Sequence, residues 1–151
     1  MRQRWQWVAV LAAGLFAINA VARFAVRLWA HDNDAQQVRI GFVAMGAIAA
    51  AAGVVMFLWG RRYPMNRALG DLTIAVLAAC LLSVLIGPFI SGSTPFKEGA
   101  GAFFALIWQY LAFAAGGAVL GLIPLMASGQ DYRSRALKRY AERQRVRPRR
   151  P

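Results

Sequence analysis

The sequence is poor in the side chains that carry out most enzyme chemistry. Its 151 residues include six carboxylates, one histidine and one cysteine, Cys80. A single cysteine excludes an internal disulfide and a cysteine-based zinc site, and within an apolar run it is usually a small packing residue. The phosphate-binding glycine loops, the HExxH zinc motif and the GxSxG nucleophile motif are also absent. We therefore predict that the protein is not an enzyme, and we assign no catalytic, cofactor-binding or metal-binding residue.

Ionisable residues are missing from the places where membrane chemistry needs them. No Asp, Glu, Lys or His lies near the centre of a long apolar run, whereas membrane enzymes and ion-coupled carriers usually keep such groups at that depth. The embedded glutamate of small multidrug exporters and the paired cysteines of membrane thiol oxidases are both absent. His31 lies beside Asp32 and Asp34, but this spacing alone does not define a metal site. We interpret that segment as a solvated loop.

Long uncharged runs dominate what is present. They cover residues 5–22, 40–60, 72–90 and 99–130, and hydrophobic residues make up 59% of the chain. About 20 helical residues cross the ~30 Å hydrocarbon core of a bilayer, and soluble proteins contain only ~45–50% apolar residues. We predict an all-α integral membrane protein in which residues 1–127 form a four-transmembrane-helix bundle. The expected helices cover about residues 5–29, 39–60, 69–89 and 101–127.

The fourth run is longer than a straight crossing requires. It spans 32 residues and contains Pro124 near its end. We therefore expect this helix to be tilted, or to bend at Pro124. Beyond it, residues 128–151 are predicted to form a basic cytoplasmic helix or tail.

The first run has a second interpretation. A basic start, a short apolar stretch and the sequence Ala20-Val21-Ala22 also resemble a signal peptide with a small-x-small cleavage site. Trp5 and Trp7 favour a membrane helix, because indole rings prefer the membrane interface. Cleavage after Ala22 remains the alternative, and it would remove the first helix.

Basic residues predict the orientation. If the four runs cross the membrane, one side holds Arg2, Arg4, Arg61, Arg62, Arg67 and nine tail residues, 14 in all, and the other side holds only 4. Short loops rich in Lys and Arg stay in the cytoplasm, so both termini are predicted to be cytoplasmic. An excess of 16 Arg over 2 Lys, with abundant Ala, is typical of GC-rich bacterial genomes. We expect a multi-pass protein of a bacterial plasma membrane.

Asp71 lies at the start of the third run. A carboxylate is favoured near a helix N-terminus by the exposed amides and the helix dipole, which is the simpler interpretation. The alternative is a salt bridge to Arg61, Arg62 or Arg67 that fixes the preceding turn.

Polar residues also follow one stripe of the first helix. Asn19, Arg23 and Arg27 are spaced four residues apart, so they lie on one face. Three interpretations are open: the arginines extend to the outer membrane surface, they pair with Asp32, Asp34, Glu98 or Gln109, or they bind an anionic group. We name Asn19, Arg23, Arg27 and Gln109 as a candidate polar site at the outer face. Trp108 and Tyr110, which flank Gln109, are candidates for an outer aromatic belt.

Small residues mark two helix faces. Gly46, Ala50 and Gly53 share a face of the second helix, and Gly117 and Gly121 form a GxxxG pair on the fourth. Small residues let helix backbones approach closely in lipid. We expect these residues to serve helix packing, either within one bundle or between this chain and a second membrane protein or copy.

The tail carries a strong positive charge. After Gln130 the sequence contains nine basic residues and two acidic ones. A basic segment beside a membrane is attracted to anionic lipid. An acidic partner protein and a ribosome or other RNA are further candidate partners, the RNA less favoured because few aromatic residues are present for base stacking. The predicted anionic-partner residues are Arg133, Arg135, Lys138, Arg139, Arg143, Arg145, Arg147, Arg149 and Arg150.

These features favour a non-catalytic role. We expect a small integral membrane protein that serves as an accessory or assembly subunit of a larger membrane complex. The alternative is a small oligomeric transporter or channel lined by polar residues of the first and fourth helices. A less favoured third interpretation is an enzyme acting on lipid, with Arg23 and Arg27 binding a phosphate.

Overall fold

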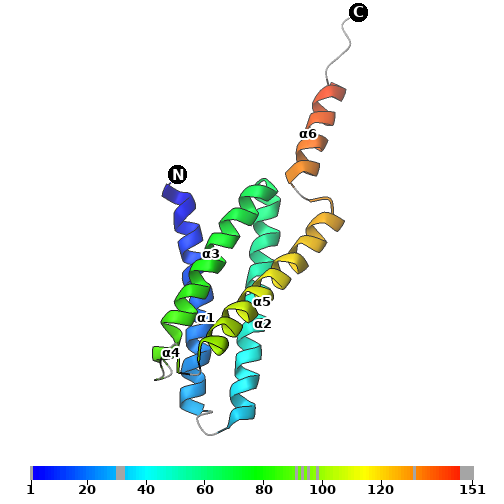
Figure 1. Ribbon diagram of the computed structural model, residues 1–151. Coiled ribbons are helices and arrows are strands. Elements are labelled where there is room, and N and C mark those ends of the chain that lie inside the picture. Colours follow the sequence, from blue (N-terminus) through cyan, green and yellow to red (C-terminus); the bar gives the residue numbers. More distant parts are fainter. Residues whose placement is uncertain are drawn as a thin grey trace, which may run out of the picture.

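The computed structural model of the chain consists of helices joined by short connections, with no strand in the part that it describes (Figure 1). It describes the backbone of residues 2–29, 33–90, 92, 94, 96, 97, 99–130 and 132–146, and the side chains of residues 4–29, 33–90, 92, 94, 96, 97, 99–130 and 134–142. The elements are α1 (Arg2–Trp29), α2 (Asp34–Arg62), α3 (Met65–Leu85), α4 (Gly87–Ile90), α5 (Gly99–Ala127) and α6 (Tyr132–Val146).

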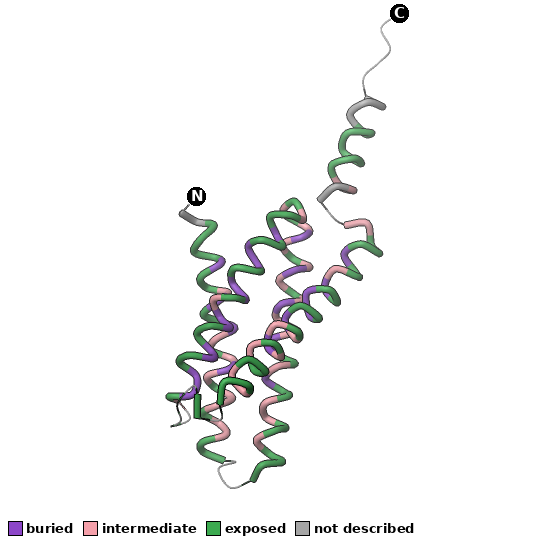
Figure 2. The backbone as a smooth tube through the Cα atoms, viewed as in Figure 1, coloured by how far each residue is buried: buried purple, intermediate pink, exposed green. Residues whose placement is uncertain are grey.

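Four of these helices are long and apolar enough to cross a membrane, as predicted for a membrane protein. They are α1, α2, α3 and α5, and their outward faces carry large apolar side chains such as Val43, Leu81 and Leu120. Figure 2 shows exposed residues along the outer faces of all four helices and buried residues where the helices meet. An apolar outer surface of this extent suits contact with lipid rather than with water.

Local sequence explains where the helices begin and end. The Asn33 side chain caps α2 by accepting a hydrogen bond from the Gln36 amide at 3.2 Å, so α2 begins five residues earlier than the predicted residue 39. Pro64 separates α2 from α3, because the residue before a proline is forced into an extended conformation, as Tyr63 is.

The third predicted helix, residues 69–89, differs from the structure at both ends. α3 begins at Met65, directly after Pro64, and ends at Leu85. The short helix α4 follows from Gly87. Pro88 cannot donate a backbone hydrogen bond, and it restricts the residue before it, which accounts for the break.

The closest helix contact is between α2 and α5, and it depends on glycine. A Cβ atom on Gly117 would lie 1.9 Å from the Ala49 carbonyl oxygen, and one on Gly121 would lie 2.1 Å from the Gly53 carbonyl oxygen. The two backbones therefore touch where the helices cross. Gly46 has open space around its Cβ position, and Ala50 is exposed, so this part of the predicted small-residue face lies on the outer surface.

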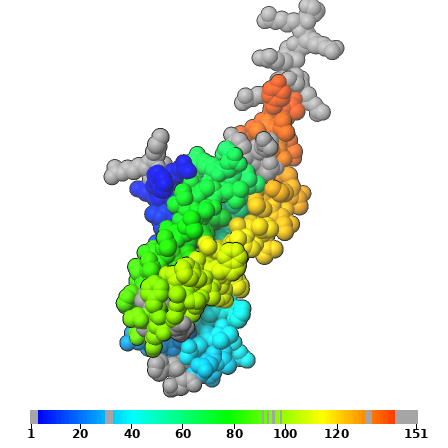
Figure 3. Space-filling view, in the orientation of Figure 1, coloured from blue at the N-terminus to red at the C-terminus, as the bar shows by residue number. Residues whose placement is uncertain are grey.

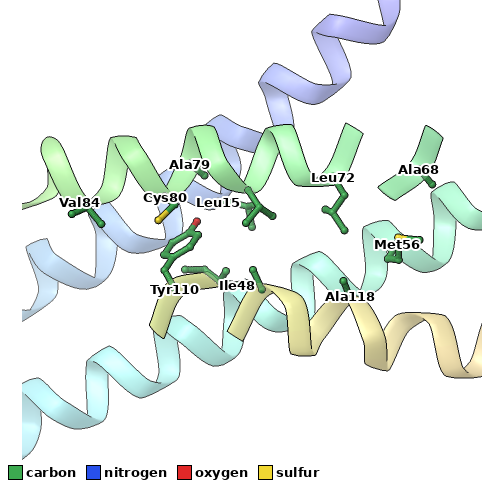
Figure 4. Packing of buried hydrophobic residues seen from close by; sticks show 12 residues of the cluster. Leu15, Ile48, Met56, Ala68, Leu72, Ala79, Cys80, Val84, Tyr110 and Ala118 are labelled. Atoms are coloured by element: carbon green, nitrogen blue, oxygen red, sulfur yellow. The ribbon is translucent and has the colours of Figure 1, made fainter. Parts of the chain in front are cut away.

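The core fills the space between these helices and α3. Figure 4 shows Ile48 and Tyr110 facing α3, with the Tyr110 hydroxyl directed toward Cys80. Tyr110 is 1% exposed, whereas Trp108 is 76% exposed. The prediction of an outer belt is therefore wrong for Tyr110. Residues two apart on a helix point about 200° away from each other, so only one of the pair can face outward.

The helix ends gather into two groups (Figure 1). The start of α1, the turn between α2 and α3, and α6 lie together, and we call this the arginine-rich end. The connection from α1 to α2 and the short α4 lie at the opposite end. α5 runs obliquely between the two ends, and its 29 residues extend about 43 Å, which exceeds the ~30 Å hydrocarbon core.

The glycine contact predicts a sharp difference between adjacent residues. Gly117→Ala is expected to lower the free energy of unfolding by about 2 kcal/mol, because the added methyl group would overlap the backbone of α2. Gly116→Ala is the matched control, since nothing lies within 4 Å of its Cβ position. Denaturant titration in detergent measures both, and equal losses would contradict the close backbone contact.

Candidate functional site

The predicted polar residues of α1 and α5 meet in a pocket near the opposite end. The pocket has a volume of about 530 Å³ and is lined by α1, α2 and α5. Asn19, Arg23 and Gln109 line it together with Gln37, which the sequence analysis did not single out. We call these four residues the polar pocket. Gln37 lies four residues after the helix-capping Asn33, within the first turns of α2, which precede the predicted start at residue 39.

The arginines of the polar stripe have different surroundings. Arg23 Nε donates a hydrogen bond to Asn19 Oδ1 at 3.0 Å. Asn19 is buried, and a Cβ atom on Gly87 would lie 2.7 Å from Arg23 Nε, so the Arg23 side chain passes close to the start of α4. Arg27 is not among the pocket-lining residues. Its Nη1 atom donates to the Ile90 carbonyl at 3.2 Å, at the end of α4.

The described lining of the polar pocket offers hydrogen-bond donors but no group for acid–base or nucleophilic chemistry. Its described polar lining consists of one guanidinium and three amides, with no Asp, Glu, His, Ser or Cys. A guanidinium with amide donors suits an anionic oxygen-bearing group. Asp32 and Glu98, which were predicted as possible partners of Arg23, lie outside the described side chains. His31 lies outside them as well. Among the residues that are described, no group of three or more His, Cys, Asp or Glu side chains could hold a metal ion.

A second polar cluster ties α1 to α3 at the arginine-rich end. Asp71 is 6% exposed, and Arg4 Nε donates to its two carboxylate oxygens at 2.9 and 3.0 Å. Arg67 Nε lies 3.9 Å from Asp71 Oδ2, and its guanidinium stacks 4.5 Å from the centre of the Tyr63 ring. The salt bridge from Asp71 to Arg67, one of the predicted alternatives, is present. The closer partner, Arg4, was not predicted, because it lies 67 residues away in the sequence.

This cluster lines a small pocket of its own. The pocket has a volume of about 260 Å³, and its lining includes Arg4, Arg62, Arg67, Asp71 and Trp7. Its described lining contains one carboxylate and three guanidinium groups. Two positive charges therefore remain unbalanced among the described lining residues.

The basic tail meets α2 at the same end. Arg135 and Arg139 of α6 line a pocket of about 310 Å³ with Arg61 and Arg62 of α2. Lys138 is exposed and is not part of this lining. The other predicted contact residues of the tail, Arg133, Arg143, Arg145, Arg147, Arg149 and Arg150, lie outside the described side chains.

Two hydroxyl groups lie close to each other in the core, and neither makes a well-formed hydrogen bond to any described group. They are Ser83 Oγ of α3 and the Tyr110 hydroxyl of α5, and neither was predicted. Both residues are 1% exposed. Because they lie among apolar side chains and border none of the three pockets, we assign them no binding role.

The Arg4–Asp71 contact predicts a stability effect that depends on its partner. Arg4→Gln is expected to lower the midpoint of thermal unfolding more than Arg67→Gln does, because Arg4 contacts both oxygens of a buried carboxylate. In the double variant Arg4→Gln, Asp71→Asn, the decrease in the unfolding midpoint should be smaller than the sum of the decreases caused by Arg4→Gln alone and by Asp71→Asn alone. Additive losses would show that the two side chains do not interact.

Comparisons with known proteins add no family assignment. No protein-family model, curated protein or solved structure matches this chain.

Proposed function

We propose that the protein is a non-catalytic accessory or assembly subunit of a larger membrane complex. In this proposal α1, α2, α3 and α5 form a transmembrane bundle in a bacterial plasma membrane, with both termini in the cytoplasm. The bundle is an anchor, and the basic helix α6 is the part that contacts anionic lipid or a partner protein.

The observation that carries this proposal is the position of α6. Figure 3 shows α6 projecting beyond the four long helices. Leu137 and Tyr140 on α6 are 68% and 62% exposed, and Arg139 is exposed beside them. A helix with exposed apolar and basic residues offers a contact surface for an amphipathic or anionic partner.

The polar pocket favours a second function, a small oligomeric transporter or channel. Asn19, Arg23, Gln37 and Gln109 come from three helices and line one pocket. A lining of this kind suits a polar or anionic solute. Four helices seldom enclose a path by themselves, so this function requires several copies of the chain around the pocket.

The mass of the native particle separates these two functions. An accessory subunit extracted from its own membranes in mild detergent is expected to migrate with at least one larger, different protein, well above the 16.5 kDa of the chain. A ring of identical copies would instead favour the transporter. Extraction as a single chain under several mild detergents would contradict both. Light scattering combined with mass spectrometry of the isolated particle gives the composition directly.

The proposed orientation predicts which end of the bundle can be labelled from outside. In intact cells, a membrane-impermeant maleimide is expected to label Lys97→Cys but not Asn66→Cys, and both after permeabilisation. Wild type supplies the background, because its single cysteine, Cys80, is 2% exposed. Labelling of Asn66→Cys alone in intact cells would mean that the arginine-rich end faces outward.

A further inference from the structure

We propose that the pocket between α2 and α6 is a binding site for the phosphate of an anionic phospholipid headgroup. The site consists of Arg61 and Arg62 at the end of α2, and of Arg135 and Arg139 on α6, with Ala136 between the latter two. We call these four arginines the arginine pocket. Its volume is about 310 Å³, enough for a phosphodiester group with part of its glycerol.

The chain builds this pocket from two segments that lie far apart in the sequence. α5 ends near α2, and the Gly129 backbone has a φ of +58°, which lets the chain turn sharply there. Ser128 Oγ donates to the Pro124 carbonyl at 2.6 Å, which secures the last turn of α5. α6 then starts beside the end of α2, and the two helices are in contact. The tail arginines are thus held against the α2 arginines.

The charges in the arginine pocket are unbalanced. Four guanidinium groups line it, and no described carboxylate does. Arg61 and Arg135 are partly buried, so their repulsion is screened less than that of fully exposed groups. By contrast, Arg4 and Arg67 share Asp71. The arginine pocket therefore calls for an anion from outside the described part of the chain, and the planar guanidinium group matches phosphate oxygens in a two-point contact.

The surroundings favour a lipid over a free phosphate. Trp59 and Tyr63 lie next to the α2 arginines in the sequence, and such aromatic residues are typical of the membrane–water interface. Leu58, one turn before Arg62 and further into the bundle, is 46% exposed. A phospholipid can place its phosphate among the arginines while its acyl chains run along the apolar outer face of α2. A free phosphate would leave that face uncovered.

This inference rests on the proposed function only in that the site must lie at a membrane surface. It requires no partner protein, so it is tested on the purified full-length chain alone. A negative lipid result would leave the accessory role intact, and a chain extracted without a partner would leave the lipid site intact.

The test is a lipid titration followed by native mass spectrometry. The delipidated chain in detergent is titrated with phosphatidylglycerol and, separately, with phosphatidylcholine of the same acyl chains. We expect wild type to bind phosphatidylglycerol more tightly. The double variant Arg61→Gln, Arg135→Gln should lose roughly 30-fold in affinity, given ~1 kcal/mol for each basic residue near anionic lipid.

The matched control is Arg39→Gln, Lys97→Gln, which removes the same charge. Arg39 lies near the start of α2 and Lys97 precedes α5, and neither lines the arginine pocket nor belongs to the basic tail. This control should change the affinity by less than about threefold, because a screened charge outside the pocket contributes little. If Arg61→Gln, Arg135→Gln loses its helical circular dichroism, the exposed pair Arg62→Gln, Arg139→Gln replaces it and should show the same selective loss.

Three results would overturn the proposal. Equal loss in the pocket variant and the control would mean that only overall charge matters. Equal binding of the two lipids by wild type would mean that the pocket does not distinguish the anionic headgroup of phosphatidylglycerol from the zwitterionic headgroup of phosphatidylcholine. Full displacement of phosphatidylglycerol by millimolar inorganic phosphate would assign the pocket to a free anion.

Discussion

The close approach of α2 and α5 is the constraint on which both ends of the molecule depend. Lipid provides no hydrophobic force between apolar helices, so their association relies on backbone proximity and packing. Gly117 and Gly121 of α5 lie against the backbone of α2 at Ala49 and Gly53, where no side chain would fit. With that crossing fixed, Gln109 lies beside Asn19 and Arg23 at one end, and the end of α5 places α6 beside Arg61 and Arg62 at the other. Each pocket is therefore a consequence of the same contact.

The two ends use their arginines in different ways. Near α4, Arg23 donates to Asn19 and Arg27 donates to the Ile90 carbonyl, so a neutral local group holds each of these two arginines. At the arginine-rich end, Arg4 is held by the buried Asp71, which joins α1 to α3. The arginines at the end of α2 have no such carboxylate in the lining they share with α6. This contrast makes the pocket beside α6 the better candidate for an external anion.

These contrasts also bear on the proposed role. If all the charged groups of a chain neutralised one another, its surface would offer no excess charge to an external partner. Here the excess charge is gathered on one surface, next to exposed apolar side chains such as Leu137. We infer that the protein acts through what it holds at that surface, with the apolar helices as its anchor.

The sequence alone determined the helical class and the number of long apolar segments, because the length and composition of a run suffice to predict a membrane-crossing helix. It also predicted the turn at Pro64, since proline acts on its nearest neighbours. Spacing along one helix grouped Asn19 with Arg23, but it could not add Gln37, which comes from another helix. Arg4 and Asp71, 67 residues apart, meet only because α1 packs on α3. Likewise, only the tertiary structure decided that Tyr110 is buried and Trp108 exposed, because a uniformly apolar helix gives no pattern that distinguishes its inner face from its outer one.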